Sequence, residues 1–331
     1  MPRKKLMFII LSGLFFILIA TFATFSLNNI FGTKLVTAKS DSVSNKKYAM
    51  LGYGISIEKS NISMKDYNIV IDKKDEFDFV TKFINNSGRK GSFLLNIYLN
   101  YEQIPFCVSD NKFSMDYVFD IGGNSEVKIP IKLDLSKLYL KNNSLVISFV
   151  AGNGKHASEL NEVTDFFGSN AEYNLILPAG EKEIEKFYSS TSSKSDYKKI
   201  NIKNNFEGIF LNQNFKDIKA FTLPKPSIRC KPGQTVKFAL RLGGYKDINN
   251  YIAWVNVGYR QYPVYGKDKY LLFNMENSDL IYKEVSIKAP MEKGKYEVWA
   301  FLAKKPLQID KKGRNERHTL DYSHRITLIV G

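Results

Sequence analysis

Two histidines and an aspartate near the end of the chain have side chains suited to holding a metal ion. His318, Asp321 and His324 offer two imidazoles and a carboxylate, which are common zinc ligands. On a strand, His318 and His324 would lie roughly 20 Å apart. One zinc ion needs each nitrogen within about 2.1 Å, so only a tight bend would join them. The third histidine, His156, is distant in sequence, and we expect no metal site.

The patterns of catalytic and phosphate-binding sites are absent or incomplete. Residues 152–155 read Gly-Asn-Gly-Lys but lack the Gly-x-x-x-x-Gly-Lys-Ser/Thr spacing of a phosphate loop. There is no Gly-x-Ser-x-Gly, His-Glu-x-x-His or Cys-x-x-Cys motif. The adjacent carboxylates Asp75 and Glu76 would point to opposite faces of a strand. We therefore predict a protein that is not an enzyme and has no cofactor.

The two cysteines do not form a shared structural disulfide. Cys107 and Cys230 occupy non-equivalent positions in two repeated halves of the chain, which excludes the intradomain bridge of antibody domains. A bridge between the halves remains an alternative in an oxidising compartment. We expect both cysteines to be buried as small apolar residues.

A short polar motif occurs twice in the chain. Tyr101, Gln103 and Pro105 recur as Tyr259, Gln261 and Pro263, at an offset of 158 residues. On one strand, the three side chains of a copy would share a face. One interpretation is a ligand groove built twice, with tyrosine stacking and glutamine hydrogen bonds. We favour a structural role, in which tyrosine caps the core and glutamine satisfies the backbone of the turn.

Further matches in the same order indicate a tandem duplication. Copy one is predicted over residues 47–178 and copy two over 196–331. The polar linker 179–195 between them includes one short candidate helix over 181–188. The matching stretches are Phe77, Phe79, Thr81 and Phe83 with Val236, Phe238, Leu240 and Leu242; Glu126–Ile129 with Glu284–Ile287; and Phe149–Ala151 with Phe301–Ala303.

Each copy shows about seven segments in which apolar and polar residues alternate, with turn residues between them. This period of two predicts half-buried strands. In the strands over 92–101 and 251–259, the residues expected to point inward are Leu95, Ile97, Leu99 and Tyr101 in copy one, and Ala253, Val255, Val257 and Tyr259 in copy two.

This strand pattern resembles the immunoglobulin-like domains of bacterial membrane-anchored surface proteins. The resemblance covers both copies and stays at the level of the superfamily. It implies an all-β chain with two tandem immunoglobulin-like or fibronectin-like β-sandwiches after an N-terminal transmembrane helix.

The N-terminal region predicts a membrane anchor. Residues Leu6 to Leu27 contain no charge and would form a helix of roughly 33 Å, enough for a hydrocarbon core of about 30 Å. A signal peptide has a shorter apolar core, and cleavage is the alternative. We expect an anchor over 1–30, a linker over 31–46, and a single-pass cell-membrane protein. Arg3, Lys4 and Lys5 stay inside, so the remainder is extracytoplasmic.

The net charge of +15 favours anionic neighbours, although a lysine-rich composition also keeps a protein soluble. The long connections before the last strand of each copy are candidate binding loops. The loop of copy two, 304–323, is basic, and the loop of copy one, 152–171, is acidic with an apolar pair; ordinary solvated loops are the alternative. The candidate contact residues are Lys304, Lys305, Lys311, Lys312, Arg314 and Arg317, with Phe166 and Phe167 as a second set.

Three functional hypotheses follow. The first is a non-enzymatic surface protein that binds a macromolecular partner, such as an anionic envelope polymer or another membrane protein. The second is a structural or accessory subunit of a cell-envelope secretion or assembly machine. The third is a carbohydrate-binding module, in which Trp254, opposite in parity to Val255 and Val257, would be an exposed stacking platform. We do not expect nucleic acid as a partner.

Overall fold

The computed structural model describes twelve long segments and one isolated residue of the chain: 53–58, 67–71, 76–108, 112–136, 138, 140–151, 168–177, 197–201, 206–218, 227–264, 267–276, 279–307 and 320–331. The predicted anchor, both linkers and the candidate helix lie outside these residues. Within the described segments, no helix is long and apolar enough to cross a membrane.

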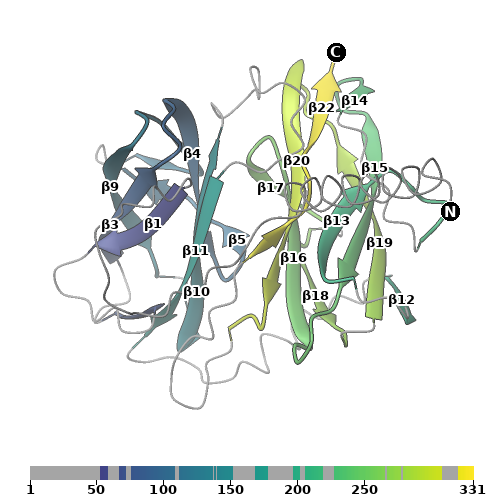
Figure 1. The fold of residues 1–331 in the computed structure, drawn as a ribbon, viewed down its shortest axis with the longest axis horizontal. Coiled ribbons are helices and arrows are strands. Elements are labelled where there is room, and N and C mark those ends of the chain that lie inside the picture. Colours follow the sequence, from purple (N-terminus) through teal and green to yellow (C-terminus); the bar gives the residue numbers. More distant parts are fainter. Residues whose placement is uncertain are drawn as a thin grey trace, which may run out of the picture. The chain divides into compact units, whose positions relative to one another are not determined.

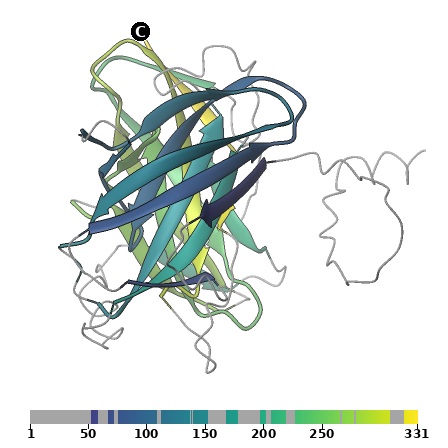
Figure 2. The same ribbon diagram turned by 90° about the vertical axis from the view of Figure 1, so that its left-hand side faces the viewer.

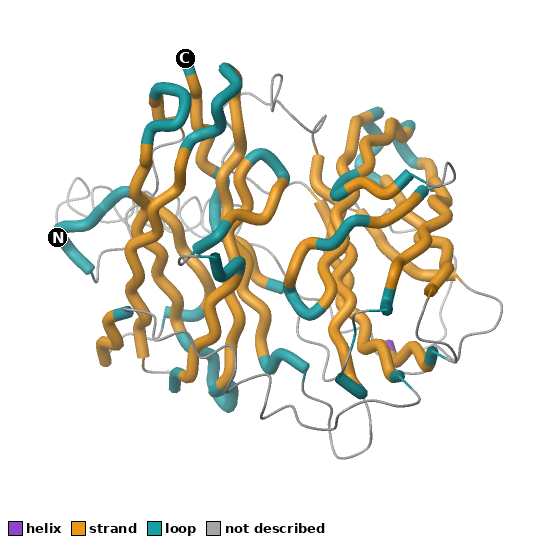
Figure 3. The backbone as a smooth tube through the Cα atoms, turned by 180° about the vertical axis from the view of Figure 1, so that it is seen from behind, coloured by secondary structure: helices purple, strands orange, loops and turns teal. Residues whose placement is uncertain are grey.

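Almost all of the described chain is strand or the turns between strands (Figure 3). Copy one has two sheets. Its outer sheet runs, in spatial order, through β1 (Tyr53–Glu58), β3 (Glu76–Asn85), β9 (Ser125–Asp134), β6 (Phe106–Cys107) and β7 (Phe113–Ser114). Its inner sheet runs through β2 (Asn68–Val70), β11 (Gly168–Ile176), β10 (Asn142–Ala151), β4 (Gly91–Leu99) and β5 (Glu102–Gln103), and β8 (Tyr117–Ile121) also pairs with β4.

Copy two has the same two-sheet arrangement (Figure 1). Its outer sheet contains β12 (Lys198–Asn201), β19 (Asp279–Lys288), β15 (Thr235–Gly243) and β13 (Gly208–Asn212). Its inner sheet contains β14 (Ser227–Cys230), β22 (Ile326–Val330), β20 (Gly294–Lys304), β16 (Asn250–Val257) and β17 (Arg260–Tyr262), with β18 (Tyr270–Asn274) on β16 and β21 (Asp321–Tyr322) on β20.

Alternation along the strands produces a core between the two sheets of each copy. In β3, Phe77, Phe79, Thr81 and Phe83 are all at most 3% exposed, whereas Asp78 is exposed. One apolar cluster joins residues of both sheets in copy one, and a second does so in copy two. Figure 2 shows the blue outer strands of copy one in front of the teal strands of its inner sheet. The all-β prediction is confirmed.

The two copies also share an unusual strand pairing. β2 runs parallel to the closing strand β11, and β14 runs parallel to the closing strand β22. All other strand pairs in the described sheets are antiparallel. A short early strand that runs parallel to the closing strand in both halves is the topology expected of a duplicated unit.

Two of the sequence matches are out of register. Leu95 pairs with Phe149, and its equivalent Ala253 pairs with Leu302, so Phe149 corresponds to Leu302 and the offset is 153. The sequence match had placed it on Phe301, which faces the other side of the sheet. A slip of one residue reverses the face of every side chain, and an apolar run on both faces conceals it.

The second discrepancy concerns the outer sheets. Glu126 and Glu284 lie on equivalent strands, β9 and β19, as predicted. However, Phe83 pairs with Val127, whereas its sequence match Leu242 pairs with Ile281 rather than with Val285. The sequence offset of 159 between β3 and β15 and the offset of 158 between β9 and β19 therefore cannot both match structurally equivalent residues. Alternation fixes which face a residue occupies, but a shift of an even number of residues leaves that face unchanged.

Both copies belong to one compact unit, residues 49–331. A third apolar cluster, which we call the seam, joins the inner sheet of copy one to the inner sheet of copy two. Its buried members are Leu94, Tyr98, Tyr101, Leu140, Val146 and Val150 from copy one, and Ile252, Trp254, Tyr259, Trp299, Phe301, Ala303, Leu307 and Leu320 from copy two.

Candidate functional site

The repeated motif begins in a tight turn rather than on a strand. Leu99 pairs with Glu102 across Asn100 and Tyr101, which have φ angles of 50° and 67°. The same turn in copy two, at Gly258 and Tyr259, has φ angles of 55° and 69°. Positive φ at both central residues is the hairpin turn of type I′.

These turns hold both tyrosines in a conformation that bulky residues rarely adopt. Tyr101 and Tyr259 are 0% exposed and belong to the seam. The prediction that they point into the core of their own copy was wrong, because the left-handed turn breaks the alternation of the preceding strand. Burial between the two copies holds each tyrosine in this strained conformation.

The two glutamines of the motif bind each other's backbone across the seam. The backbone N–H of Gln103 donates to Oε1 of Gln261 at 2.7 Å, and the N–H of Gln261 donates to Oε1 of Gln103 at 2.7 Å. Nε2 of Gln103 donates to the carbonyl of Tyr259 at 3.3 Å, and Nε2 of Gln261 donates to the carbonyl of Tyr101 at 2.8 Å.

Several of these contacts join a residue of copy one to the residue at the equivalent position of copy two. Gln103 and Gln261 are 158 residues apart, as are Tyr98 and Asn256, whose Nδ2 donates to the tyrosine hydroxyl at 2.5 Å. Contacts between equivalent positions are the signature of an isologous interface, here formed within one chain. The motif therefore lies on a pseudo-two-fold axis between the copies.

The motif also departs from the prediction in two details. Tyr101, Gln103 and Pro105 do not share a strand, because β5 contains only Glu102 and Gln103. The glutamine amides bond to the turn of the opposite copy in addition to their own copy. Pro105 and Pro263 are exposed.

Buried polar groups complete the seam. Nη2 of Arg325 donates to the carbonyl of Ala151 in the other copy at 3.1 Å, and its guanidinium lies 5.6 Å from the ring of Trp299. In copy one, the hydroxyls of Tyr101 and Ser144 donate to Oε1 of Glu172 at 2.7 Å and 2.6 Å. Burial raises the pKa of Glu172, and these two hydrogen bonds oppose the shift.

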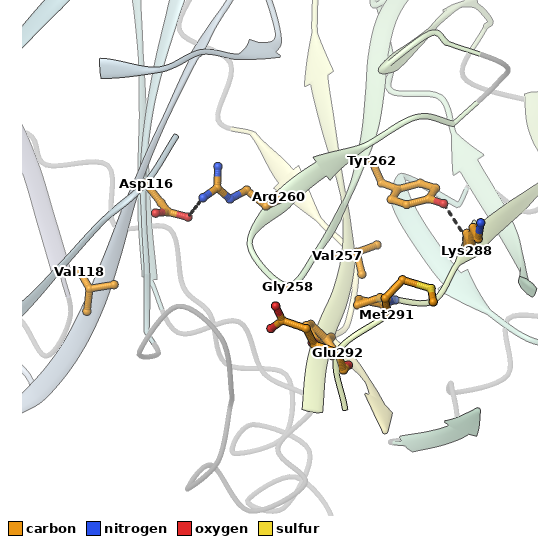
Figure 4. A pocket seen from close by; sticks show the side chains of 11 residues that line it. Asp116, Val118, Val257, Gly258, Arg260, Tyr262, Lys288, Met291 and Glu292 are labelled. Atoms are coloured by element: carbon orange, nitrogen blue, oxygen red, sulfur yellow. Dashed lines mark hydrogen bonds and ion pairs between the residues drawn. The ribbon is translucent and has the colours of Figure 1, made fainter. Parts of the chain in front are cut away.

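One side of the seam opens into a pocket of about 730 Å³ (Figure 4). Volumes of 300–1,000 Å³ are typical of ligand sites. The lining comes from β8 of copy one with the residue before it, and from three regions of copy two: the β16–β17 hairpin, the end of β19, and the turn before β20 together with the start of β20. The lining residues are Asp116, Val118, Val257, Gly258, Arg260, Tyr262, Lys288, Pro290, Met291, Glu292 and Tyr296.

Paired charges and exposed apolar groups define this seam pocket. Nη2 of Arg260 lies 2.8 Å from Oδ2 of Asp116, which ties the two copies together at the pocket wall. Val118 is 43% exposed and Met291 is 72% exposed. Burial and the nearby Glu292 carboxylate raise the pKa of Tyr296, which keeps its hydroxyl protonated. The polar part of the lining consists of two carboxylates, two basic side chains and two tyrosine hydroxyls. The pocket has the size and the mixed polar and apolar lining of a ligand site.

The residues predicted as contacts lie elsewhere. Phe166, Phe167, Lys311, Lys312, Arg314 and Arg317 are outside the described residues, as is His318. Lys304 does not point into solvent: its side chain is 9% exposed, and Nζ lies 3.0 Å from Oδ1 of Asp321 and 4.2 Å from the ring centre of Tyr245. Lys305 is half-buried in a turn with φ of 47°.

Trp254 is not an exposed platform. It is 0% exposed and stacks on Phe301 inside the seam, at 4.9 Å between ring centres. Its predicted parity holds, because it faces away from the core that contains Val255 and Val257. The face opposite the core is covered by the other copy.

Cys107 and Cys230 are both buried and unpaired, so the alternative of a bridge between the copies was wrong.

Sequence reasoning missed every residue of the seam pocket, since they come from segments far apart in the chain. One signal was available at Val118. In β8, Phe119 and Ile121 face the core, which leaves Val118 as an apolar residue on the outward face.

Comparisons with known proteins give no family. No family model matches the chain, and no curated protein matches it. Among solved structures, red sea bream transglutaminase is 8% identical with a TM-score of 0.23, and the match covers 84% of this chain and 31% of that protein. A family 123 glycoside hydrolase from Clostridium perfringens is 12% identical with a TM-score of 0.24, covering 39% of this chain and 28% of that protein. At these TM-scores neither match establishes a shared fold, and the chain spans less than a third of either protein's length.

Proposed function

We propose that this chain is a non-enzymatic, membrane-anchored protein whose two immunoglobulin-like sandwiches bind a macromolecular partner outside the cell membrane. The observation that carries the proposal is the seam pocket, which is open, partly apolar and held between two copies by an interdomain ion pair. Such a surface on a rigid frame can hold a partner without reorganising.

Charge supports an anionic partner. The chain carries a net charge of +15, and its basic segment contains Lys311, Lys312, Arg314 and Arg317 within seven residues. Exposed charges further apart than a Debye length of about 8 Å are largely screened, so a cluster attracts a polyanion more strongly than dispersed lysines do. In this proposal the basic segment attracts the partner, and the seam pocket contributes apolar contact.

Replacing those four basic residues together with serine tests the proposal. Full-length protein in nanodiscs of zwitterionic lipid is titrated with fluorescent polyglutamate at several salt concentrations. We expect weaker binding with a flatter salt dependence, because four positive charges that would attract the polyanion are removed. Thermal unfolding of the variant shows that it is folded.

A matched control replaces four exposed lysines of copy two, Lys216, Lys231, Lys237 and Lys246, with serine. The basic segment has no special role if this control loses as much binding as the variant. The proposal of an anionic partner fails if neither polyglutamate nor vesicles of phosphatidylglycerol bind the wild-type protein.

A further inference from the structure

The pseudo-two-fold symmetry of the seam is broken at the pocket. Leu145 pairs with Leu99 and Val298 pairs with Val257, which makes Lys293 the equivalent of Leu140. Similarly, Leu95 pairs with Tyr117 and Ala253 pairs with Leu271, which makes Val118 the equivalent of Leu272.

The two sides of the axis are therefore filled differently. Leu140 is buried within the seam cluster, and Leu272 packs against it. Their equivalents do not fill the other side: Lys293 is exposed, and Val118 is 43% exposed beside the pocket. The seam pocket thus lies on the side of the inter-copy interface where Val118 and Lys293 stand at the positions that Leu272 and Leu140 occupy on the other side.

The surroundings favour an occupant in extended conformation. Among the described strands, β8 pairs with β4 alone, so its other edge offers backbone donors and acceptors beside Val118. Added strands commonly bind to such edges and place alternate side chains into pockets. Met291, 72% exposed, supplies a flexible apolar wall that can adapt to the incoming side chain.

Charge adds a second preference. Lys288 lines the pocket and is exposed, and its ammonium group has no carboxylate partner among the described residues. Arg260 and Asp116 already neutralise each other. Glu292 is the second carboxylate of the lining, so it is beside Lys288 that an acidic residue of the occupant would complement the pocket.

We propose that the seam pocket binds a leucine-like side chain of an extended, acidic peptide segment from a partner protein, with that segment adding as a strand to β8. This inference rests on the proposed function and specifies the chemistry of its partner. On one side of the axis, Leu140 and Leu272 of this chain fill the interface. In the seam pocket on the other side, the leucine-like side chain of the partner would fill it.

Selection from random peptides tests the proposal. A bead-displayed library of random octapeptides is panned against the full-length protein in detergent micelles, and the selected peptides are measured by fluorescence anisotropy. We expect them to share leucine or isoleucine at one position with aspartate or glutamate nearby. Replacing that leucine with serine should weaken binding at least about tenfold, the scale of burying one such side chain.

Variants of the protein locate the site. Val118→Asp and Met291→Asp should each weaken binding of the selected peptides at least about tenfold, since each places a charge on the apolar wall. Val70→Asp is the matched control, because Val70 is 48% exposed on β2 of the same sheet and does not line the pocket. Lys288→Gln should reduce the salt dependence. Thermal unfolding of each variant shows that it is folded.

The proposal is overturned if the selected peptides show no preference for a branched apolar residue, or if Val118→Asp and Val70→Asp bind them equally. It is also overturned if chito-oligosaccharides bind the wild-type protein, lose affinity in Val118→Asp, and no peptide binds. Failure of the peptides while polyglutamate still binds through the basic segment would leave the proposed function standing and remove only this inference.

Discussion

Gln103 and Gln261 each use both ends of their side-chain amide across the seam. Each accepts one hydrogen bond from the opposite backbone and donates one in return. Each also donates within its own copy, to the carbonyl of Met115 or of Lys269. Since three bonds are lost on truncation and a typical bond contributes about 1 kcal/mol, Gln103→Ala or Gln261→Ala should each cost about 2–3 kcal/mol.

Urea unfolding of full-length protein in micelles measures this cost. Each amide bonds only to backbone atoms, which alanine keeps, so the double variant loses six separate hydrogen bonds and should cost about the sum of the two single variants. Gln213→Ala is the matched control and should stay within about 0.5 kcal/mol, since this residue makes one long, exposed bond of 3.5 Å. A cost of less than about 0.5 kcal/mol at either glutamine would contradict the reciprocal arrangement.

Burial of Glu172 should make the stability of the protein depend on pH. Its pKa is raised by burial, so the folded protein binds this proton more tightly than the unfolded chain. The stability contributed by Glu172 is therefore present below the unfolded pKa and falls as pH rises through the raised value. Glu172→Gln keeps an acceptor for Tyr101 and Ser144 and removes the buried charge.

Thermal melts between pH 4 and pH 8 check this sign. The variant should melt above the wild type at pH 8, and the difference should vanish toward pH 4. Glu102→Gln, at an exposed residue, should show no such trend. A wild type that is more stable than Glu172→Gln at pH 8 would mean that the carboxylate is stabilised by a cation instead.

At this scale the sequence predicted a structural role for the motif but not the contact between the copies. The repetition of Tyr101 and Gln103 as Tyr259 and Gln261 marks a shared structural demand. It does not say which backbone the amides meet, because that depends on how two copies pack. The same limit explains Trp254: parity predicted its face correctly, but only the other copy's surface decides its exposure.

At the scale of the elements, the strands could be predicted from the alternation of apolar and polar residues, because most strands have one face packed on a core. β16 and β20 are different: they read Asn-Tyr-Ile-Ala-Trp-Val-Asn-Val and Gly-Lys-Tyr-Glu-Val-Trp-Ala-Phe-Leu-Ala-Lys, with apolar residues on both faces. Such strands are typically buried on both sides. That pattern was the available signal for the seam, and the same pattern hid the one-residue slip between β10 and β20.

Gly258 tests the turn that positions the motif. Its φ is 55°, and an added Cβ would lie 2.7 Å from Cδ1 of Tyr296. Gly258→Ala should therefore destabilise the protein by about 1–3 kcal/mol in urea unfolding. Gly54→Ala is the matched control: its Cβ would meet Ile84 at an ordinary 3.6 Å, and a strand glycine gains up to about 1 kcal/mol on becoming alanine. Equal effects at the two glycines would contradict the turn assignment.

At the scale of the whole molecule, the two copies are one folded body joined through the seam. The chain contains two tryptophans, Trp254 and Trp299, and both are 0% exposed within the seam. Tryptophan fluorescence therefore reports the seam alone, whereas far-UV circular dichroism reports the sheets of both copies.

Urea unfolding followed by both signals is the most direct test of that claim. We expect a native emission typical of buried indole and coincident transitions, because a cooperative unit loses its seam and its sheets together. A fluorescence transition at lower urea, with the circular dichroism unchanged, would show that the copies separate while still folded and would contradict the account.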